Sequence, residues 1–385
     1  ITKLSFPRTA FYSFSVTKSV PEDAEVGSNV SLVAATDKDS SFNQEIRYWL
    51  RAAEGRFSVD PVSGMVSVAG ALDRETKAEY ELLLVAEDQG RPARSATATL
   101  LVQVSDVNDN VPEFSASQHQ AVVLETALAG TSLLTLSAVD PDQGQNGNVS
   151  YSIFQQSPPS DPAVFSVDPV SGMVSVAGAL DRETKAEYEL LLVAEDQGRP
   201  ARSATATLLV QVSDVNDNVP EFSASQHQAV VLETALAGTS LLTLSAVDPD
   251  QGQNGNVSYS IFQQSPPSDP AVFELDPSSG TLRLVRPLDY SEVKVYSLTV
   301  QASDGGTPSL VGNSSVEVKV VDVNNNPPEF SQRSYDVEVS ENLAGGASIL
   351  SLEVTDRDEV TQRHRPGLQR QRPSVPDDPG PPAGP

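Results

Sequence analysis

The chain of 385 residues has no cysteine, one tryptophan and three histidines. Without cysteine, no disulfide can stabilise a fold, and thiol content says nothing about the redox compartment. Basic residues are also scarce, with 25 against 52 acidic ones and a formal net charge of −27. A protein that binds nucleic acid needs the opposite balance, so we expect no nucleic-acid partner.

Long apolar runs are missing as well. No stretch is long enough to span a membrane, and the residues after Ile1 show no signal-peptide pattern. We therefore expect any membrane anchor to lie in a segment outside this chain. Four Asn-x-Ser sequons favour a secreted glycoprotein, and they begin at Asn29, Asn148, Asn256 and Asn313.

Catalytic motifs are absent from the sequence too. No GxSxG, HExxH or GxGxxG string and no phosphate-binding loop occurs in its required context. Close carboxylate pairs could in principle serve acid–base chemistry, but they have no neighbouring histidine, lysine or aromatic pocket signal. His119 and His227 are expected in solvated loops, and Trp49 is expected to have a structural role in a strand. We expect no enzyme, and a calcium-dependent hydrolase would need a pocket elsewhere.

What the sequence does contain is repetition. Residues 57–165 are identical to residues 165–273, at an offset of 108. The same offset relates three linker strings, which begin at Asp106, Asp214 and Asp322. A period of this size predicts an array of autonomous domains, because a solenoid repeat is much shorter.

The identical block begins in the middle of one repeat and ends in the middle of the next. Repeat 2 is therefore a hybrid, whose first half matches repeat 3 and whose second half matches repeat 1. Either a recent in-register duplication or an error in the gene model explains this, and long-read sequencing of the transcript distinguishes them. The predicted segments are repeat 1 (1–111), repeat 2 (112–219), repeat 3 (220–327), a partial repeat 4 (328–359), and a disordered basic, then Pro/Gly-rich tail (360–385). The partial repeat is expected to contain two strands between Ser334 and Thr355.

The residue pattern of each repeat predicts short β-strands. In repeat 1, residues 79–88 and 96–106 alternate apolar and polar side chains, which is typical of a sheet with one buried face. Turn signals rich in proline and glycine separate the runs. The prediction is an all-β protein of tandem seven-stranded Greek-key sandwiches in an elongated array. The expected strands of repeat 1 are residues 13–20, 28–36, 45–50, 56–60, 64–70, 79–88 and 96–106.

Acidic residues gather at the two ends of each predicted sandwich. If strand direction alternates, the "LDRE" string at Leu72 and the "DVNDN" string at Asp106 lie at one end. The "DxD" pair Asp37 and Asp39 and the "AxD" ending in Asp88 lie at the other. In a tandem array these opposite ends meet. Dense carboxylate oxygen suits calcium better than zinc, which prefers nitrogen and sulfur ligands.

These strings, in this order and at one period, resemble cadherin repeats from about Phe11 to Asp358, of the protocadherin, Fat-like or Dachsous-like type. The resemblance implies about three calcium ions in each complete junction. It also implies ligands from side-chain oxygen of Asn108 and from backbone carbonyls at Asn110 and Asn146. The expected ligands of junction 1 are Glu22, Asp73, Glu75, Asp106, Asn108, Asp109, Asn110, Asp140, Asp142, Asn146 and Asp196.

Two further junctions are expected. The third lacks two carboxylates, because Ser291 and Asn325 stand where the earlier repeats have glutamate and aspartate, so we expect weaker or incomplete loading there. The half-site at Asp37, Asp39 and Asp88 has no upstream partner in this chain. Junction 2 would use Glu125, Asp181, Glu183, Asp214, Asn216, Asp217, Asn218, Asp248, Asp250, Asn254 and Asp304. Junction 3 would use Glu233, Asp289, Asp322, Asn324, Asp356 and Asp358.

The resemblance implies calcium-dependent cell–cell adhesion or recognition at the extracellular face of the plasma membrane. The expected partner is another cadherin ectodomain, bound homophilically or heterophilically. The alternative is a passive extracellular spacer or tether, with binding done by repeats outside this chain.

Overall fold

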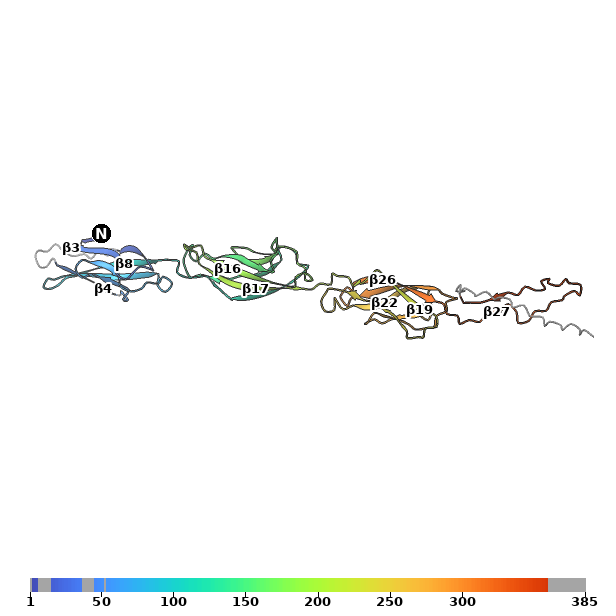
Figure 1. Cartoon of the computed structure of the whole chain (residues 1–385). Helices are drawn as coiled ribbons and strands as arrows, with labels where there is room; N and C mark the ends of the chain where they lie inside the picture. The colour runs from blue at the N-terminus through green and yellow to red at the C-terminus, as the bar shows by residue number, and fades with distance from the viewer. Residues whose placement is uncertain (1, 6–14, 37–44, 52, 359–385) are drawn as a thin grey trace, which may run out of the picture. The chain divides into compact units, whose positions relative to one another are not determined.

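The computed structural model describes residues 2–5, 15–36, 45–51 and 53–358, which form strands and turns without a helix (Figure 1). The prediction of an all-β fold is confirmed. Within these described residues, none lies in a helix long and apolar enough to cross a membrane. The chain divides into two compact units, residues 1–215 and 216–385, which are treated separately below.

The first unit contains two sandwiches, each made of short antiparallel and parallel strands. The strands of repeat 1 are β1 (Thr2–Ser5), β2 (Ser15–Pro21), β3 (Asn29–Thr36), β4 (Ile46–Arg51), β5 (Phe57–Val59), β6 (Met65–Val68), β7 (Glu79–Asp88) and β8 (Ser95–Ser105). The strands of repeat 2 are β9 (Glu113–Phe114), β10 (Gln118–Leu124), β11 (Ser132–Thr135), β12 (Ala138–Val139), β13 (Ser150–Ser157), β14 (Phe165–Val167), β15 (Met173–Val176), β16 (Glu187–Glu195) and β17 (Ser203–Ser213).

The second unit contains one sandwich and a short two-stranded ladder. The strands of repeat 3 are β18 (Glu221–Phe222), β19 (Gln226–Leu232), β20 (Ser240–Thr243), β21 (Ala246–Val247), β22 (Ser258–Ser265), β23 (Phe273–Leu275), β24 (Thr281–Leu284), β25 (Val295–Ser303) and β26 (Val311–Val321). The ladder pairs β27 (Glu329–Phe330) with β28 (Val354–Thr355).

Two sheets face each other in every repeat. In repeat 1 one sheet has the order β2-β8-β7-β4 and the other β1-β3-β6-β5. The first expected strand, residues 13–20, corresponds to β2, which pairs parallel with β8. A further strand that was not predicted, β1, pairs parallel with β3 in the opposite sheet. The other six expected strands occur within one or two residues of their predicted limits.

Apolar side chains at alternate positions of the long strands form the core of each sandwich. In β7 the predicted inner face of Tyr80, Leu82, Leu84 and Ala86 is buried, with at most 8% of any side chain exposed. The outer neighbour Val85 is also buried and lies opposite half-buried Trp49 of β4, which fits the structural role expected of this tryptophan. Burying such side chains stabilises the fold by roughly 1.5–3 kcal/mol each.

The two sheets are joined by one aromatic contact that recurs in all three repeats. Phe57 of β5 meets Tyr80 of β7 edge-on, with ring centroids 5.2 Å apart. In hybrid repeat 2 the same separation joins Phe165 to Tyr188, at 5.2 Å. Phe165 is the residue at which the two identical blocks meet, so the seam between blocks lies inside a packed sandwich.

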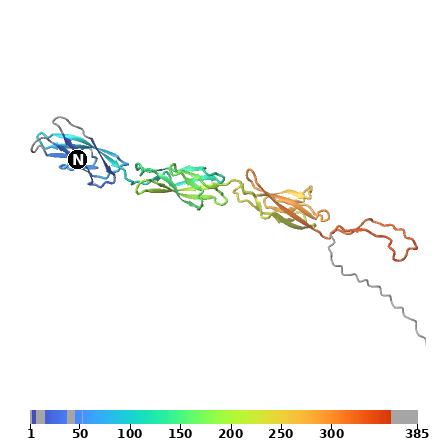
Figure 2. The ribbon, with the colours of Figure 1, turned by 90° about the horizontal axis from the view of Figure 1, so that it is seen from above.

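Two expectations were wrong. His119 and His227 lie within β10 and β19 and not in loops, and the Nε2 atom of each is buried. Strands expected between Ser334 and Thr355 are absent from the described residues up to β28, and Figure 2 shows this segment as an open loop. About two strands cannot bury a core, because they have no second sheet to cover their apolar face.

Candidate metal centre

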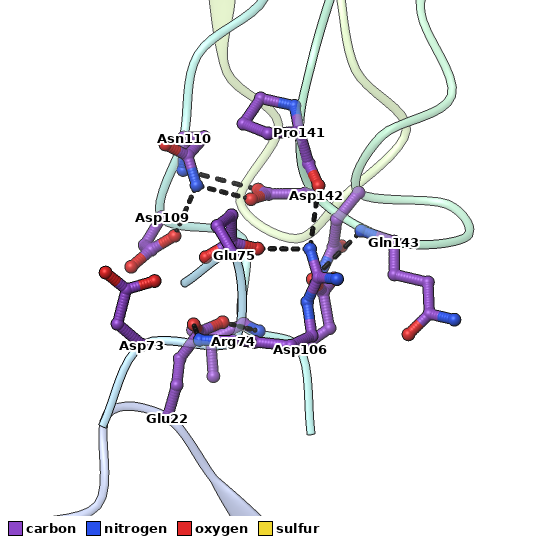
Figure 3. A network of polar contacts seen from close by, with 12 residues as sticks. Glu22, Asp73, Arg74, Glu75, Asp106, Asp109, Asn110, Pro141, Asp142 and Gln143 are labelled. Atoms are coloured by element: carbon purple, nitrogen blue, oxygen red, sulfur yellow. Dashed lines mark hydrogen bonds and ion pairs between the residues drawn. The ribbon is translucent and has the colours of Figure 1, made fainter. Parts of the chain in front are cut away.

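The acidic residues of repeat 1 are fixed at the end of the sandwich that adjoins repeat 2. Glu22 follows β2 and is only 5% exposed. Its Oε2 accepts the backbone N–H of Arg74 at 2.8 Å, and its Oε1 accepts the N–H of Val107 at 2.7 Å. One carboxylate therefore holds the "LDRE" turn and the linker together (Figure 3).

Two groups of carboxylates at this end are compact enough to hold a cation. In the first group, Glu22, Asp73 and Glu75 each offer an oxygen within 4.8 Å of the others. In the second, Glu75, Asp109 and Asp142 meet the same criterion. Since Asp142 belongs to repeat 2, the second group joins both repeats, with Glu75 shared between the groups.

Asn108 supplies an amide oxygen beside these groups. Its Nδ2 donates to the backbone carbonyl of Pro200 at 2.6 Å and to both carboxylate oxygens of Asp196. Its Oδ1 is buried without a hydrogen-bond partner. The close approach depends on Gly198, where an added Cβ would lie 2.3 Å from Asn108 Nδ2.

Repeat 2 contributes its own carboxylates. Asp142 accepts the backbone and side-chain N–H groups of Asn110, at 3.2 and 2.6 Å. Asp140 Oδ1 accepts the N–H of Asp142 at 3.0 Å, while its Oδ2 is buried without a partner. Asp196 is 3% exposed and accepts the N–H groups of Gly198 and Arg202.

The electrostatics of the site disfavour the charged carboxylates. Burial and then the charge of Glu22 raise the pKa of Glu75 and of Asp109 above the usual range. Burial also raises the pKa of Asp140, with Asp142 as the nearest like charge that adds to it. Asp73 is the exception, because the Thr76 hydroxyl and N–H hold its pKa below the usual value. Excess negative charge of this kind is relieved by a bound cation.

Asp106, an expected ligand of junction 1, accepts hydrogen bonds from three protein donors. Asp106 Oδ1 accepts the N–H of Gln143 at 2.9 Å and Arg74 Nε at 2.5 Å. Its Oδ2 accepts the side-chain amide of Asn146 at 2.8 Å. Asp106 is thus engaged by protein donors, and it belongs to neither carboxylate group. The expectation for Asn146 concerned its backbone carbonyl, on which this contact does not bear.

The donor set fits calcium. A buried amide oxygen and a buried carboxylate oxygen without hydrogen-bond partners, Asn108 Oδ1 and Asp140 Oδ2, accompany two carboxylate groups. Calcium takes six to eight oxygen ligands, whereas zinc prefers nitrogen and sulfur, which these residues do not supply.

The expected ligands of junction 2 fall on both units, and each half repeats the local geometry. In the first unit, Glu125 accepts the N–H groups of Arg182 and Val215, at 2.9 and 2.6 Å. Arg182 also pairs with Asp214 at 2.5 Å. Burial and then Glu125 raise the pKa of Glu183, while Asp181 accepts the Thr184 hydroxyl, which lowers its pKa.

The half of junction 2 in the second unit matches the repeat-2 side of junction 1. Asn216 Nδ2 donates to Asp304 Oδ2 at 3.1 Å, and the Oδ1 of Asn216 is buried without a hydrogen-bond partner. Asn218 donates to both oxygens of Asp250. Asp217, Asp248 and Asn254 lie in the same described stretch.

Junction 3 has fewer carboxylates than the other two, which is the basis of the prediction of weaker loading. Glu233, Asp322 and Asp358 form the one metal-sized group found here among the described residues. Ser291 donates its N–H and hydroxyl to Asp289 Oδ1 instead of adding a carboxylate. The remaining expected ligands of this junction are Asp356, which accepts the N–H of Asp358, and Asn324, which is exposed.

The half-site at the other end of repeat 1 is only partly described. Asp88 is 9% exposed and accepts the N–H groups of Gly90 and Arg94. Asp37 and Asp39 lie outside the described residues. Sequence reasoning missed Arg74 and Arg182, whose guanidinium groups lie among the acids. The R of the repeated "LDRE" string was the available signal.

Fold and junction together define a protein of tandem β-sandwiches with clusters of acidic residues at the ends of the repeats. A family model described as the cadherin domain matches residues 17–105, 119–213 and 227–321. The chain therefore belongs to the cadherin family, and the resemblance seen in its motifs is confirmed.

Curated relatives and solved structures agree with this assignment. Protocadherin Fat 1 of Homo sapiens is 40% identical over 342 residues, covering 88% of this chain and 7% of the relative. Cadherin EGF LAG seven-pass G-type receptor 1 of Mus musculus is 39% identical, covering 88% of this chain and 12% of the relative. This chain thus spans a small part of both relatives.

Among solved structures, mouse cadherin-23 EC22-24 aligns with a TM-score of 0.71 and 33% identity, covering 80% of this chain and 96% of that one. Protocadherin Gamma B2 extracellular cadherin domains 1-5 align with a TM-score of 0.79 and 28% identity, covering 93% and 67%.

Proposed function

We propose that this chain is part of an extracellular rod that calcium stiffens for cell–cell adhesion or recognition. The observation that carries the proposal is the pair of buried oxygens without hydrogen-bond partners, Asn108 Oδ1 and Asp140 Oδ2. They accompany two carboxylate groups, one of which takes Asp142 from repeat 2. Membership of the cadherin family supports the same reading.

The mechanism is electrostatic. Eight carboxylates were assigned to junction 1 from sequence, and two charges about 5 Å apart at an effective dielectric near 20 repel by roughly 3 kcal/mol. Several such pairs would drive neighbouring repeats apart. Bound calcium neutralises them and takes ligands from both repeats, so the repeats are held in one orientation. The protein itself orients the ligands, as Asp196 does for the amide of Asn108.

The ligand set and domain limits of this proposal are those expected from sequence. Junctions 1 and 2 would each hold about three ions, and junction 3 fewer, because Ser291 adds no carboxylate there. The repeats would meet near residues 111–112 and 219–220, where the linker strings end.

Location and partner follow from the relatives. We infer a position on the outer cell surface, with any membrane anchor outside this chain. The inferred partner is another cadherin ectodomain, of the same or a different kind. The net charge of −27 argues against nucleic acid.

The pocket described for repeat 2 lacks the side chains that acid–base catalysis needs. A cavity of about 530 Å³ between β13 and β14 is lined by apolar, amide, hydroxyl and proline side chains, with no carboxylate, histidine or lysine. A general acid or base near neutral pH would need one of those groups. We therefore propose a binding and structural role.

Three measurements test the proposal. Calorimetry should show calcium uptake, and small-angle scattering should show a larger maximum dimension with calcium than with chelator. Absence of uptake at the first two junctions would refute the calcium mechanism. Beads coated with the chain should cluster in calcium and separate in chelator; beads that never cluster would favour a passive spacer whose binding repeats lie elsewhere.

A further inference from the structure

Strands β7 and β16 share the sequence EYELLLVAE, yet the same valine is buried in one strand and uncovered in the other. Val85 of β7 is 2% exposed and has Trp49 of β4 as its cross-strand neighbour on the outer face of the sheet. Val193 of β16 is half-buried, and its neighbour on β13 is Ser152, whose side chain is too short to cover it. The outer face of this sheet in repeat 2 therefore lacks the aromatic cover that it has in repeat 1.

The edge of this surface in repeat 2 carries an exposed phenylalanine. Phe154 of β13 is 73% exposed and lies at a β-bulge, where the register shifts between Ile153 and Gln155. Gln155 lies opposite Leu191, the next outward-facing aliphatic residue of β16. Phe154, Leu191 and Val193 all lie outside the packed core of the sandwich. A contiguous apolar surface of this kind is typical of an interaction site.

Repeat 3 has the phenylalanine without the aliphatic surface. Phe262 of β22 is 66% exposed and lies at the matching bulge. Its neighbours on β25 are Thr299 and Gln301, which stand where repeat 2 has Leu191 and Val193. Among the three repeats, as far as the structure describes them, the exposed ring and the uncovered aliphatic side chains therefore occur together in the hybrid repeat alone.

The charges around this surface are of one sign. Glu189 and Glu195 of β16 are exposed and flank Leu191 and Val193 along the strand. The four strands of this sheet contain no lysine or arginine. An apolar surface with acidic side chains at its rim favours a partner whose apolar groups are flanked by basic ones.

The corresponding sheet of repeat 1 presents that chemistry. Tyr48 of β4 points into the core and is 7% exposed. Arg47, Trp49 and Arg51 therefore face outward, because side chains alternate along a strand. Both arginines are exposed, and neither forms an ion pair with a carboxylate in the part of the chain that the structure describes. The glutamates of β7 match those of β16, so the two arginines are what distinguishes the charge of this surface.

The repeat 2 face is defined by Phe154, Glu189, Leu191, Val193 and Glu195, and the repeat 1 face by Arg47, Trp49 and Arg51. We propose that the repeat 2 face of one chain docks on the repeat 1 face of a second copy. The aliphatic and phenyl groups then pack on the indole ring, and the glutamates meet the arginines. Only the class of partner, a second cadherin ectodomain, rests on the proposed function, because neither face contains an expected calcium ligand.

Unlike faces pair better than like faces in this arrangement. Two copies of the repeat 2 face would bring their glutamates together, and juxtaposed like charges disfavour association. Aromatic side chains and arginine are enriched at protein interfaces, and here the two faces supply both. The contact should form with calcium and with chelator.

Sedimentation velocity of the full chain over a concentration series tests the apolar part of the contact. Phe154→Ser should weaken self-association about tenfold or more, because a few aromatic residues carry most of the energy of an interface. Phe262→Ser changes the same local sequence in repeat 3 and should leave self-association unchanged. Both side chains are exposed, so the melting temperature should stay the same in each variant. Equal losses in the two variants would overturn the assignment to repeat 2.

Charge reversal tests the pairing of the two faces. Glu189→Lys with Glu195→Lys gives a chain with two basic faces, and Arg47→Glu with Arg51→Glu gives a chain with two acidic faces. Each double variant alone should remain monomeric, since like charges would meet. An equal mixture of the two should associate again, because each basic face then finds an acidic one. The pairing is wrong if the mixture stays monomeric or if the first double variant still associates with itself.

Calorimetry with calcium separates this inference from the proposed function. A chain that takes up calcium but stays monomeric at about 100 μM, with and without the ion, would keep the calcium mechanism and overturn the docking. A chain that associates and responds to the substitutions as expected, but takes up no calcium, would keep the docking and refute the calcium mechanism. Bead clustering in calcium that Phe154→Ser leaves unchanged would place adhesion on another surface and overturn the docking.

Discussion

The side-chain amide of Asn108 donates to both carboxylate oxygens of Asp196, at 3.1 and 3.2 Å, although 88 residues separate them in the chain. This contact fixes which end of the amide is nitrogen and which is oxygen. Because the nitrogen is committed to Asp196 and to a backbone carbonyl, the buried oxygen is left for another ligand. The orientation of the Asn108 side chain is therefore a main reason to infer a bound cation at junction 1.

The first prediction concerns this asparagine. Asn108→Ala removes the buried oxygen and should lower calcium affinity at junction 1 by roughly 10–100-fold, the range found when groups that orient or complete a metal site are lost. Calorimetry would measure it. The control is Asn313→Ala, which should leave calcium affinity unchanged, because Asn313 is exposed on β26 and belongs to no expected ligand set. Equal affinity losses in the two variants would contradict the assignment.

The second prediction is a gain of binding at junction 3. Ser291→Glu combined with Asn325→Asp restores the two carboxylates that this junction lacks relative to the others. The double variant should bind at least one more calcium ion than the unsubstituted chain, since site affinity rises with the number of charged ligands. Ser291→Gln with Asn325 unchanged adds length without charge and should leave the stoichiometry as it was. An unchanged stoichiometry in the double variant would locate the defect of junction 3 elsewhere.

The third prediction is a pH dependence with opposite signs in calcium and in chelator. A carboxyl group whose pKa is raised on folding stabilises the folded state below its unfolded pKa, about 4, and loses that contribution as pH rises through the folded pKa. Burial raises the pKa of Glu75, Asp109 and Asp140 in this way. In chelator, the melting temperature should therefore fall as pH rises from about 4.5 to 7.5.

Calcium reverses this trend because it binds only the deprotonated carboxylates. With calcium present, the melting temperature should rise over the same pH range, so the two curves diverge as pH increases. Below about pH 4 stability should fall in both conditions, since turn hydrogen bonds lower the pKa of groups such as Asp276, to about 2. Parallel curves between pH 4.5 and 7.5, measured by circular dichroism, would argue against calcium binding at these acids.

The fourth prediction concerns the core. Leu82 of β7 is fully buried, and Leu82→Ala should cost repeat 1 roughly 2–5 kcal/mol of unfolding free energy through lost contacts and a cavity. Denaturant unfolding of the chelated chain should show an earlier transition for one repeat while the other transitions stay in place. Val62→Ala, at a 73% exposed position, serves as the control and should change stability by less than about 0.5 kcal/mol.

The fold could be predicted well because the alternation of apolar and polar residues along a strand indicates which side chains are buried. The inner faces of β7 and β8 were read correctly, down to Val104 near the end of β8. Strand β1 was not predicted, because its four residues, Thr2–Ser5, are too few to show a periodic pattern. Strands after Ser334 were predicted from local pattern alone, and pattern does not supply the missing second sheet.

Much of the candidate site followed from motif order, since residues from separated strings reach the same end of a sandwich when strands alternate in direction. Glu22, Glu75 and Asp142 were each placed at junction 1 this way, and the structure brings all three into the two acidic groups. Motif spacing did not predict the hydrogen bonds that Asp106 accepts from Arg74 and from the backbone N–H of Gln143.

The packing of Phe165 on Tyr188 has an evolutionary consequence. Phe165 ends one parental block and begins the next, yet its ring meets the tyrosine with the same 5.2 Å separation as in the non-hybrid domain. Genetic recombination at Phe165 would exchange the N-terminal half of one domain for that of another without disturbing the hydrophobic core. Unequal recombination at such a point can lengthen or shorten the array by a whole domain while leaving every remaining domain foldable.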